Sequence, residues 1–315
     1  MSAATEPTPP VGLPPESPRR LTLSEWRAAL RGSFASFIAD DCMGLSKQVA
    51  YSSLLAFFPA VVLLVGLLGL FGAYDQLQKF LGAVAPKAVI DAIQIAQDSA
   101  SGKEGSLVAV IVGGVLAVWA ASGAMDTIVK AINRAYERVE TRPIYRLRAI
   151  SILLVLLTGI VTAGVFVLIV FGGPIGEAIA TRADLGTEFT DVWDIARWPI
   201  AFLAILAFFA LVYYLAPNME QRSWKWVSPG SFLGALMWLA LSGLFALYTA
   251  FASSYDRTYG SLAGAIVLLL WLNYSAYALL YGAELNAELE RQADIHAAGG
   301  PHAGLIPPAR RVSSS

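Results

Sequence analysis

The 315-residue chain has little charge and almost no cysteine or histidine. Charged residues make up 14% of it and hydrophobic residues 57%, with a mean hydropathy of +0.61. This balance excludes a soluble globular domain and indicates a polytopic membrane protein. The single cysteine, Cys42, excludes an internal disulfide framework and a multi-cysteine metal site. Because the net charge is only −1, no nucleic-acid partner is expected.

The chain also lacks the motifs of common enzymes. No GxSxG, Walker A, HExxH or zinc-ligand spacing occurs in it. His296 and His302 lie in a tail that contains glycine and proline, where solvated side chains are the simplest interpretation. A nuclease would need clustered carboxylates or paired histidines beside a basic groove, and neither pattern is evident. We therefore expect no enzymatic activity, no cofactor and no metal.

Six apolar segments are long enough to cross a bilayer as helices. They cover about Val49–Gly72, Leu107–Asn133, Ile150–Gly173, Trp198–Pro217, Trp226–Ser254 and Gly260–Glu290. Sixteen of the 22 Lys and Arg residues fall in the segments on the N-terminal side of the membrane. Because positive charge is enriched in cytoplasmic segments, both termini are predicted to be cytoplasmic. The sequence thus predicts an all-α membrane protein with six transmembrane helices.

The chain ends are predicted to lie outside this membrane domain, which we place at residues 21–292. Residues 1–20 are rich in proline and predict a disordered leader, and residues 293–315 predict a disordered cytoplasmic tail. The first helix places Trp26 and Phe34 on one face at helical spacing, which is typical of an interfacial helix lying on the membrane. A soluble helix packed on the body is the alternative.

Two connections on the outer side carry patterns of their own. Apolar spacing in Tyr74–Gly102, interrupted by Ala85-Pro86, predicts two short amphipathic helices at the outer surface. The segment Ala183–Ile195 is acidic and contains two aromatic residues. We interpret it as an outer connection between the third and fourth spans.

The sixth span carries a stripe of polar side chains on one helical face. The stripe consists of Asn273, Tyr277, Tyr281, Glu284 and Glu288, at steps of four, four, three and four. Polar groups inside a membrane are costly when they face lipid, so the stripe is expected to face protein or a water-filled path. The alternative for Glu284 is a carboxylate that reaches the interface. Lys47 or Gln48 at the inner end of the first span could pair with Glu284, and Tyr51 lies just inside that span.

The inner end of the second span is also polar. Asp126 and Lys130 are four residues apart in the order that favours a helical ion pair, and Asn133 and Arg134 follow. One hypothesis is that these four residues form a charged floor beneath a cavity. The alternative is a solvated salt bridge at a helix end, which contributes little.

Several segments, in the right order, resemble the YihY/BrkB family of bacterial inner-membrane proteins. The resemblance is carried by QVAYSSLLAFFPAVVLLVGLLGLFG, ASGAMDTIVKAINRAYERVETRPIYRLRA, YYLAPN, VSPGSFLGALMW and YGSLAGAIVLLLWLNYSAYALLYGAELNAEL. It implies a six-helix bundle in the cytoplasmic membrane. The family was long labelled a ribonuclease, a label widely regarded as a misassignment, and members have been linked to serum resistance, export and envelope lipids.

The leading functional hypothesis is a non-enzymatic protein that moves an amphiphile across or within the inner membrane, with membrane lipids as partners. In this hypothesis Glu284 and Lys130 form an inner gate or a charge relay, while Asn273, Tyr277 and Tyr281 provide hydrogen bonds along the path. A structural or scaffold protein of the envelope is the alternative, and a membrane ribonuclease is a remote one.

Overall fold

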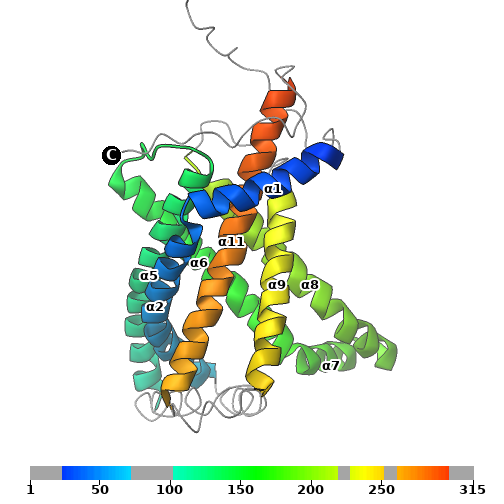
Figure 1. Ribbon diagram of the computed structural model, residues 1–315. Helices are drawn as coiled ribbons and strands as arrows, with labels where there is room; N and C mark the ends of the chain where they lie inside the picture. The colour runs from blue at the N-terminus through cyan, green and yellow to red at the C-terminus, as the bar shows by residue number, and fades with distance from the viewer. Residues whose placement is uncertain (1–22, 72–101, 219–227, 252–260, 298–315) are drawn as a thin grey trace, which may run out of the picture.

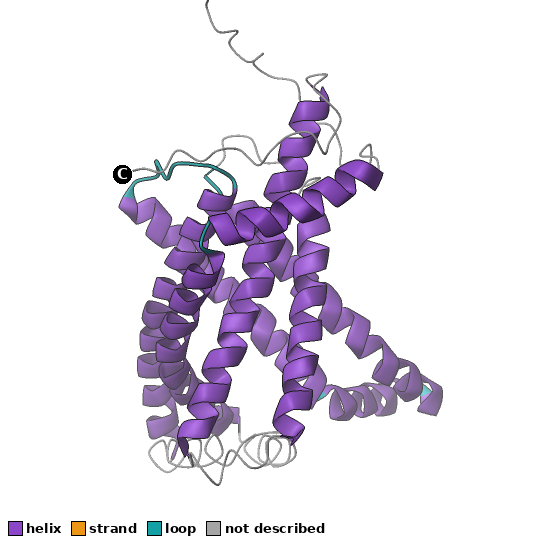
Figure 2. Ribbon diagram, viewed as in Figure 1, coloured by secondary structure: helices purple, strands orange, loops and turns teal. Residues whose placement is uncertain are grey.

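The computed structural model describes residues 23–71, 102–218, 228–251 and 261–297, and all regular elements in these ranges are α-helices (Figure 1, Figure 2). They are α1 (Leu23–Ala39), α2 (Cys42–Phe71), α5 (Gly102–Ala135), α6 (Ile144–Val170), α7 (Gly172–Ala183), α8 (Gly186–Leu215), α9 (Ser228–Phe251) and α11 (Ser261–Ala297). Of these, α2, α5, α6, α8, α9 and α11 are long and apolar enough to cross a membrane. The predicted all-α fold with six spans is confirmed. Helices suit this setting because they satisfy their own backbone hydrogen bonds.

Helices α2 and α6 begin earlier than the predicted spans, because single residues at their N-termini determine where each helix starts. Helix α2 begins at Cys42, seven residues before the predicted Val49, because Asp41 caps it. The Asp41 Oδ1 accepts a hydrogen bond from the Gly44 backbone N–H at 3.2 Å, as an N-cap residue does. Helix α6 likewise begins directly after Pro143, whose ring excludes it from a helix interior but not from a helix start.

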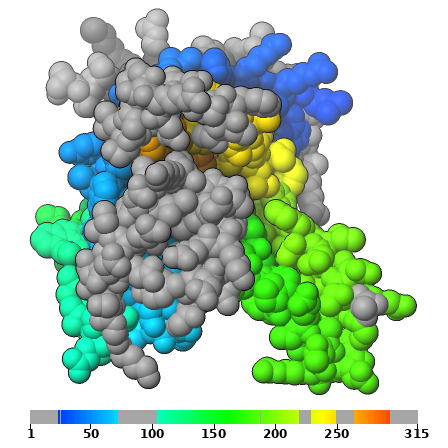
Figure 3. Space-filling model, turned by 90° about the horizontal axis from the view of Figure 1, so that it is seen from below, coloured from blue at the N-terminus to red at the C-terminus, as the bar shows by residue number. Residues whose placement is uncertain are grey.

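The acidic segment Ala183–Ile195 is not a separate connection. Helix α7 ends at Ala183, and α8 begins at Gly186 and runs through Pro199 to Leu215. The Trp193 Nε1–H donates a 2.7 Å hydrogen bond to the Gly172 carbonyl oxygen, so α7 packs against the first turns of α8. Together they form a helical hairpin that projects from the rest of the molecule (Figure 1, Figure 3). The helices predicted within Tyr74–Gly102 lie almost wholly outside the described residues.

Helix α11 occupies the centre of the bundle, in contact with α1, α2, α5 and α9 (Figure 1). Between Ala276 and Gln292 most of its side chains are buried and the rest are partly buried, as expected for a helix surrounded by others. The buried side chains include Ala276, Ala278, Leu279, Leu280, Ala283, Glu284, Leu285, Asn286, Glu288 and Leu289. The helix continues to Ala297, past the predicted end of the membrane domain at residue 292.

Helix α1 lies across α11 at one end of the bundle (Figure 1). We call this the inner end, because the charge bias predicts it to be cytoplasmic. The face of α1 that packs on the bundle includes Ala29, Ser33 and Phe37, which are all buried. Phe34 and Ile38 are exposed, so the packed helix also offers apolar side chains to its surroundings. Packing on the body and lying at the interface are therefore compatible, and the interfacial position stays a prediction.

Glycine residues allow two pairs of spans to pack so closely that the backbone of one helix contacts the neighbouring helix. A Cβ on Gly113 of α5 would lie 2.7 Å from the Leu63 backbone nitrogen of α2. At the other contact, the Gly230 N–H of α9 donates a 2.8 Å hydrogen bond to Asn286 Oδ1 of α11. Because lipid gives no hydrophobic drive for helices to associate, such close packing and polar contacts hold spans together.

Replacing Gly230 with valine is expected to destabilise the protein. The new Cβ would lie 2.5 Å from Asn286 Cγ, and overpacking of this kind costs about 1–3 kcal/mol. The unfolding temperature of the detergent-solubilised protein should fall. Gly243→Val is the matched control in the same helix, since a Cβ there meets nothing within 4 Å. An equal fall in both variants would contradict the proposed contact.

Candidate functional site

The polar stripe of α11 lies against α1 and the start of α2, and is covered by them. The Phe37 ring of α1 meets the rings of Tyr277 and Tyr281 edge to face, with centroids 5.8 and 5.9 Å apart. The Ser33 hydroxyl donates a 3.3 Å hydrogen bond to the Tyr281 hydroxyl oxygen. Asn273, two turns deeper in the membrane, has an Oδ1 that is buried without a hydrogen-bond partner among the described residues.

The most unusual group of the stripe is Glu284. It is 1% exposed and accepts a hydrogen bond from the Cys42 thiol at 3.4 Å. No cation pairs with it in the part of the chain that the structure describes. Lys47 and Gln48, the partners considered from the sequence, are exposed on α2. A carboxylate whose contact is a weak thiol donor is thus enclosed where α1, α2 and α11 meet.

One turn further along, Glu288 has the partners that Glu284 lacks. Its carboxylate forms an ion pair with Arg291 at 2.5 Å and accepts a 2.9 Å hydrogen bond from Gln292. It also packs on Gly32 of α1, where any Cβ would clash with it. The two glutamates of the stripe are both buried, but only Glu288 is locally neutralised.

The four residues of the predicted charged floor do not contact one another, because three of them are bound to separate partners and Lys130 is exposed. Asp126 pairs with Arg148 of α6 at 2.7 Å rather than with Lys130, which is exposed. Asn133 turns toward the connections at the inner end, and Arg134 donates a 2.9 Å hydrogen bond to the Asp40 carbonyl oxygen at the end of α1. The spacing puts all four on one side of α5, but their partners come from α6, from the end of α1 and from the inner connections, so the side chains do not meet.

Two further hypotheses from the sequence concern Tyr51 and the pairing of Lys130 with Glu284. Tyr51 is 61% exposed on α2 and lies outside the buried cluster around Glu284. Lys130 is exposed on α5 while Glu284 is buried beside Cys42, so the two are not paired as the inner gate would require.

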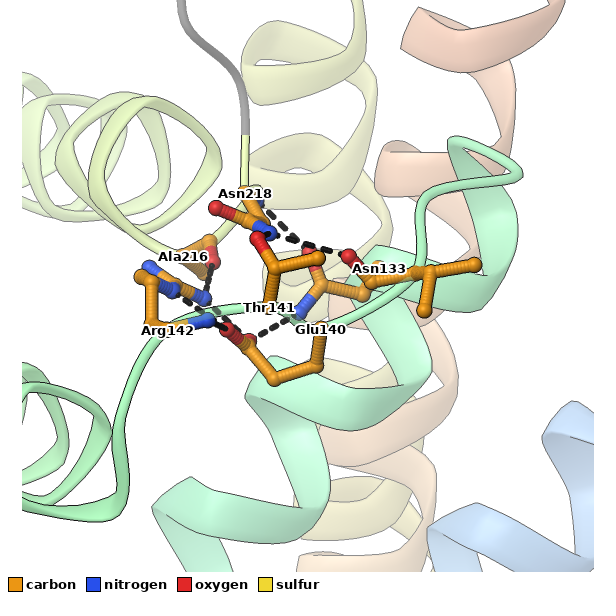
Figure 4. A network of polar contacts seen from close by, with 7 residues as sticks. Asn133, Glu140, Thr141, Arg142, Ala216 and Asn218 are labelled. Atoms are coloured by element: carbon orange, nitrogen blue, oxygen red, sulfur yellow. Dashed lines mark hydrogen bonds and ion pairs between the residues drawn. The ribbon is translucent and has the colours of Figure 1, made fainter.

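Asn133 belongs to a polar network that ties together two connections at the inner end (Figure 4). Its Nδ2 donates to Glu140 Oε2 at 2.7 Å, and its Oδ1 accepts from the Asn218 backbone N–H at 2.7 Å. Arg142 forms an ion pair with Glu140 at 2.6 Å and also donates to the Ala216 carbonyl oxygen at 2.9 Å. We call these residues the inner clamp. It fastens the α5–α6 connection to the end of α8.

Glu140 organises the inner clamp, although sequence reasoning did not single it out. The hydrogen bond from the Arg142 side chain, opposed in part by burial, holds the pKa of Glu140 below its usual value of 4.5. Asn133 was considered as part of the charged floor, and Arg142 lies in a segment that carries the family resemblance. The sequence feature that could have indicated the clamp is the cluster of polar residues around Pro143. A loop that is bounded by proline and carries both charges favours ion pairs between neighbouring side chains.

The geometry defines a helical membrane protein with six candidate spans and a buried carboxylate, and the comparison with known proteins supports the membrane-protein class. The profile of the family described as "Virulence factor BrkB" matches residues 33–306, so the chain belongs to this family. No solved structure matches. Within the described residues, no group of three or more His, Cys, Asp or Glu side chains could hold a metal ion.

Relatives cover the chain to different extents. The ribonuclease-like protein YfkH of Bacillus subtilis (strain 168) is 29% identical over 84% of this chain and 95% of its own length. A UPF0761 membrane protein of Azoarcus sp. (strain BH72) is 24% identical over 85% of this chain and 65% of its own length. The chain therefore spans nearly all of the Bacillus protein but under two thirds of the Azoarcus one.

Glu140→Gln is expected to lower the unfolding temperature at pH 7, because hydrogen bonds to a charged group are worth about 1.5–3 kcal/mol each. A lowered pKa means that this stabilisation is complete above the unfolded value, near 4.5, and is lost as the pH falls through the folded value. The unfolding temperature of the wild type should therefore drop below pH 4.5 more steeply than that of the variant. Glu177→Gln, an exposed carboxylate on α7, is the control. Parallel acid limbs for wild type and Glu140→Gln would refute the assignment.

Proposed function

We propose that the protein is a non-enzymatic integral protein of the bacterial cytoplasmic membrane that moves or handles an amphiphile through its helix bundle. The amphiphile would be an envelope lipid or a small exported molecule. The observation that carries the proposal is Glu284, a carboxylate 1% exposed inside an apolar span with a thiol as its hydrogen-bond donor. Ionisable groups within spanning helices are costly and mark a substrate, ion or proton pathway in many membrane proteins.

The rest of the stripe supports a path rather than an isolated site. Asn273 and Glu284 are eleven residues apart, or about 16 Å along the helix, which is about half the thickness of the hydrocarbon core. The unpaired Asn273 Oδ1, the tyrosine hydroxyls and the carboxylate can accept hydrogen bonds from hydroxyl or amine groups of an amphiphile. Opening the path would require α1 to move, since α1 covers Tyr277 and Tyr281. No Walker A motif occurs, so movement would be downhill or coupled to an ion.

The covering of the stripe by α1 also favours a second candidate, a structural protein of the envelope. In that case the Ser33–Tyr281 and Cys42–Glu284 contacts simply lock helices together. The exposed Phe34 and Ile38 of α1 would then contact a partner or the membrane surface.

Phospholipid movement in reconstituted liposomes distinguishes a transport protein from a structural one. Wild-type protein is expected to move labelled phospholipid between leaflets, and Glu284→Gln to reduce this movement toward the level of protein-free liposomes. The amide keeps the size of the side chain but removes its charge and its capacity to exchange a proton. Glu177→Gln on the exposed face of α7 is the matched control and should behave as wild type.

Folding must be equal in all variants, which gel filtration and the unfolding temperature report. Movement that is equal in wild type and Glu284→Gln would remove Glu284 from the path. No movement in any protein, with small solutes also retained, would favour the structural function.

The name of the Bacillus relative makes RNA cleavage a necessary comparison. We expect the purified protein to leave RNA intact in the presence of Mg²⁺, since nuclease chemistry needs clustered ligands for the metal. Intact RNA after incubation, read by gel electrophoresis, is the expected result. Mg²⁺-dependent cleavage that disappears in Asp126→Asn would instead establish an enzyme.

A further inference from the structure

A groove runs along the outside of the bundle between α5 and α6, away from the polar stripe of α11. It has a volume of about 450 Å³, and its lining includes Val115, Val118, Trp119, Ser122, Arg148 and Ile152. Trp119 is 68% exposed, so the groove opens to whatever surrounds the bundle. Because both helices are membrane spans, that surrounding at the level of Trp119 is lipid.

One end of the groove is polar and charged. Arg148 Nη1 pairs with Asp126 Oδ2 at 2.7 Å, which holds the guanidinium in place at the inner end of the groove. The Arg148 side chain is still 40% exposed, and a guanidinium has five N–H donors, so donors remain for a second partner. Lys130 is exposed one turn beyond Asp126 on the same helical face. Asp126, Lys130 and Arg148 together leave an excess of one positive charge.

The groove covers most of the depth of one leaflet. Its lining on α5 extends from Gly114 to Ser122, eight residues or about 12 Å along the helix, and Arg148 lines it from α6. One leaflet contributes about 15 Å of hydrocarbon. The apolar lining is therefore long enough to hold most of an acyl chain, and Arg148 provides a cation toward the inner end, where the phosphate of the same leaflet would be.

We propose that the groove between α5 and α6 binds one anionic phospholipid of the inner-end leaflet, with an acyl chain along Val115 and Trp119 and the phosphate on Arg148. A guanidinium binds phosphate oxygens in a planar fork, and Asp126 orients that fork. Lys130 adds preference for a headgroup with net negative charge. The site is distinct from the α11 stripe, so it goes beyond the proposed function and does not depend on it.

Lipid titration of the purified full-length protein in detergent, read by native mass spectrometry, tests the site. Phosphatidylglycerol is expected to bind about tenfold more tightly than phosphatidylcholine. Arg148→Gln should weaken phosphatidylglycerol about tenfold, since a charged hydrogen bond contributes about 1.5–3 kcal/mol and each 1.4 kcal/mol is tenfold. Arg146→Gln removes the same charge from an exposed position two residues away and should change affinity less than twofold.

Because Arg148→Gln leaves Asp126 without its partner, the double variant Asp126→Asn/Arg148→Gln provides a neutral pair and should weaken phosphatidylglycerol by the same factor. Val115→Trp fills the groove and should weaken both lipids, whereas Leu203→Trp, at an exposed position of α8, should not. Equal affinity for the two lipids, or an unchanged Arg148→Gln, would overturn the proposal. Full competition by soluble glycerol 3-phosphate would show an anion site without a lipid. A dimer that Val115→Trp dissociates would show that a second copy fills the groove.

Discussion

The burial of the inner half of α11 is the constraint on which the rest of the structure depends. A helix enclosed on all sides in a membrane must satisfy each polar side chain from its neighbours, because lipid offers no hydrogen bonds. Asn286 meets the Gly230 backbone, and Glu288 meets Arg291 and Gln292. The Tyr213 hydroxyl of α8 also donates a 2.6 Å hydrogen bond to the Leu279 carbonyl oxygen. These contacts fix α8 and α9 against α11, and Glu284 is the polar side chain of the set that receives the weakest one.

Periodicity was sufficient to predict the elements of the fold but not all of their ends. The six spans could be predicted from long apolar segments, because the length and hydropathy that a bilayer requires are properties of each segment by itself. The ends depend on single residues whose effect is local, such as the Asp41 cap that begins α2 early. The fourth span was predicted to begin at Trp198, but α8 begins at Gly186 and includes Pro199, which a spanning helix tolerates when neighbours satisfy the freed carbonyl.

In the candidate site, the sequence likewise predicted which side chains share a helical face but not which residues they contact. Spacing along α11 correctly placed Tyr277, Tyr281 and Glu284 on one face, because a face is a property of one helix. Their partners were not predictable, since Cys42 and Phe37 come from helices whose packing the pattern of α11 does not contain. Asp126 is the clearest case. The i, i+4 rule favoured Lys130, but the pairing that forms is with Arg148, which α6 brings close. An interhelical partner held by packing loses less side-chain entropy than two exposed side chains on one helix.

The inner clamp holds one end of the bundle rigid, whereas access to Glu284 would require an element at the same end to move. The clamp, with Glu140 paired to Arg142 and Asn133 bound to Asn218, makes the α5–α6 connection and the end of α8 a rigid unit. Helix α1 is held differently, by small side chains, the Phe37 ring and hydrogen bonds through Ser33 and Arg134. Apart from the Arg134 hydrogen bond, these contacts are individually worth about 1 kcal/mol, less than the charged hydrogen bonds of the clamp, so α1 is easier to displace than the clamp. If the stripe on α11 opens, α1 is therefore the element that moves, and the clamped helices α5 and α8 form the frame against which it moves.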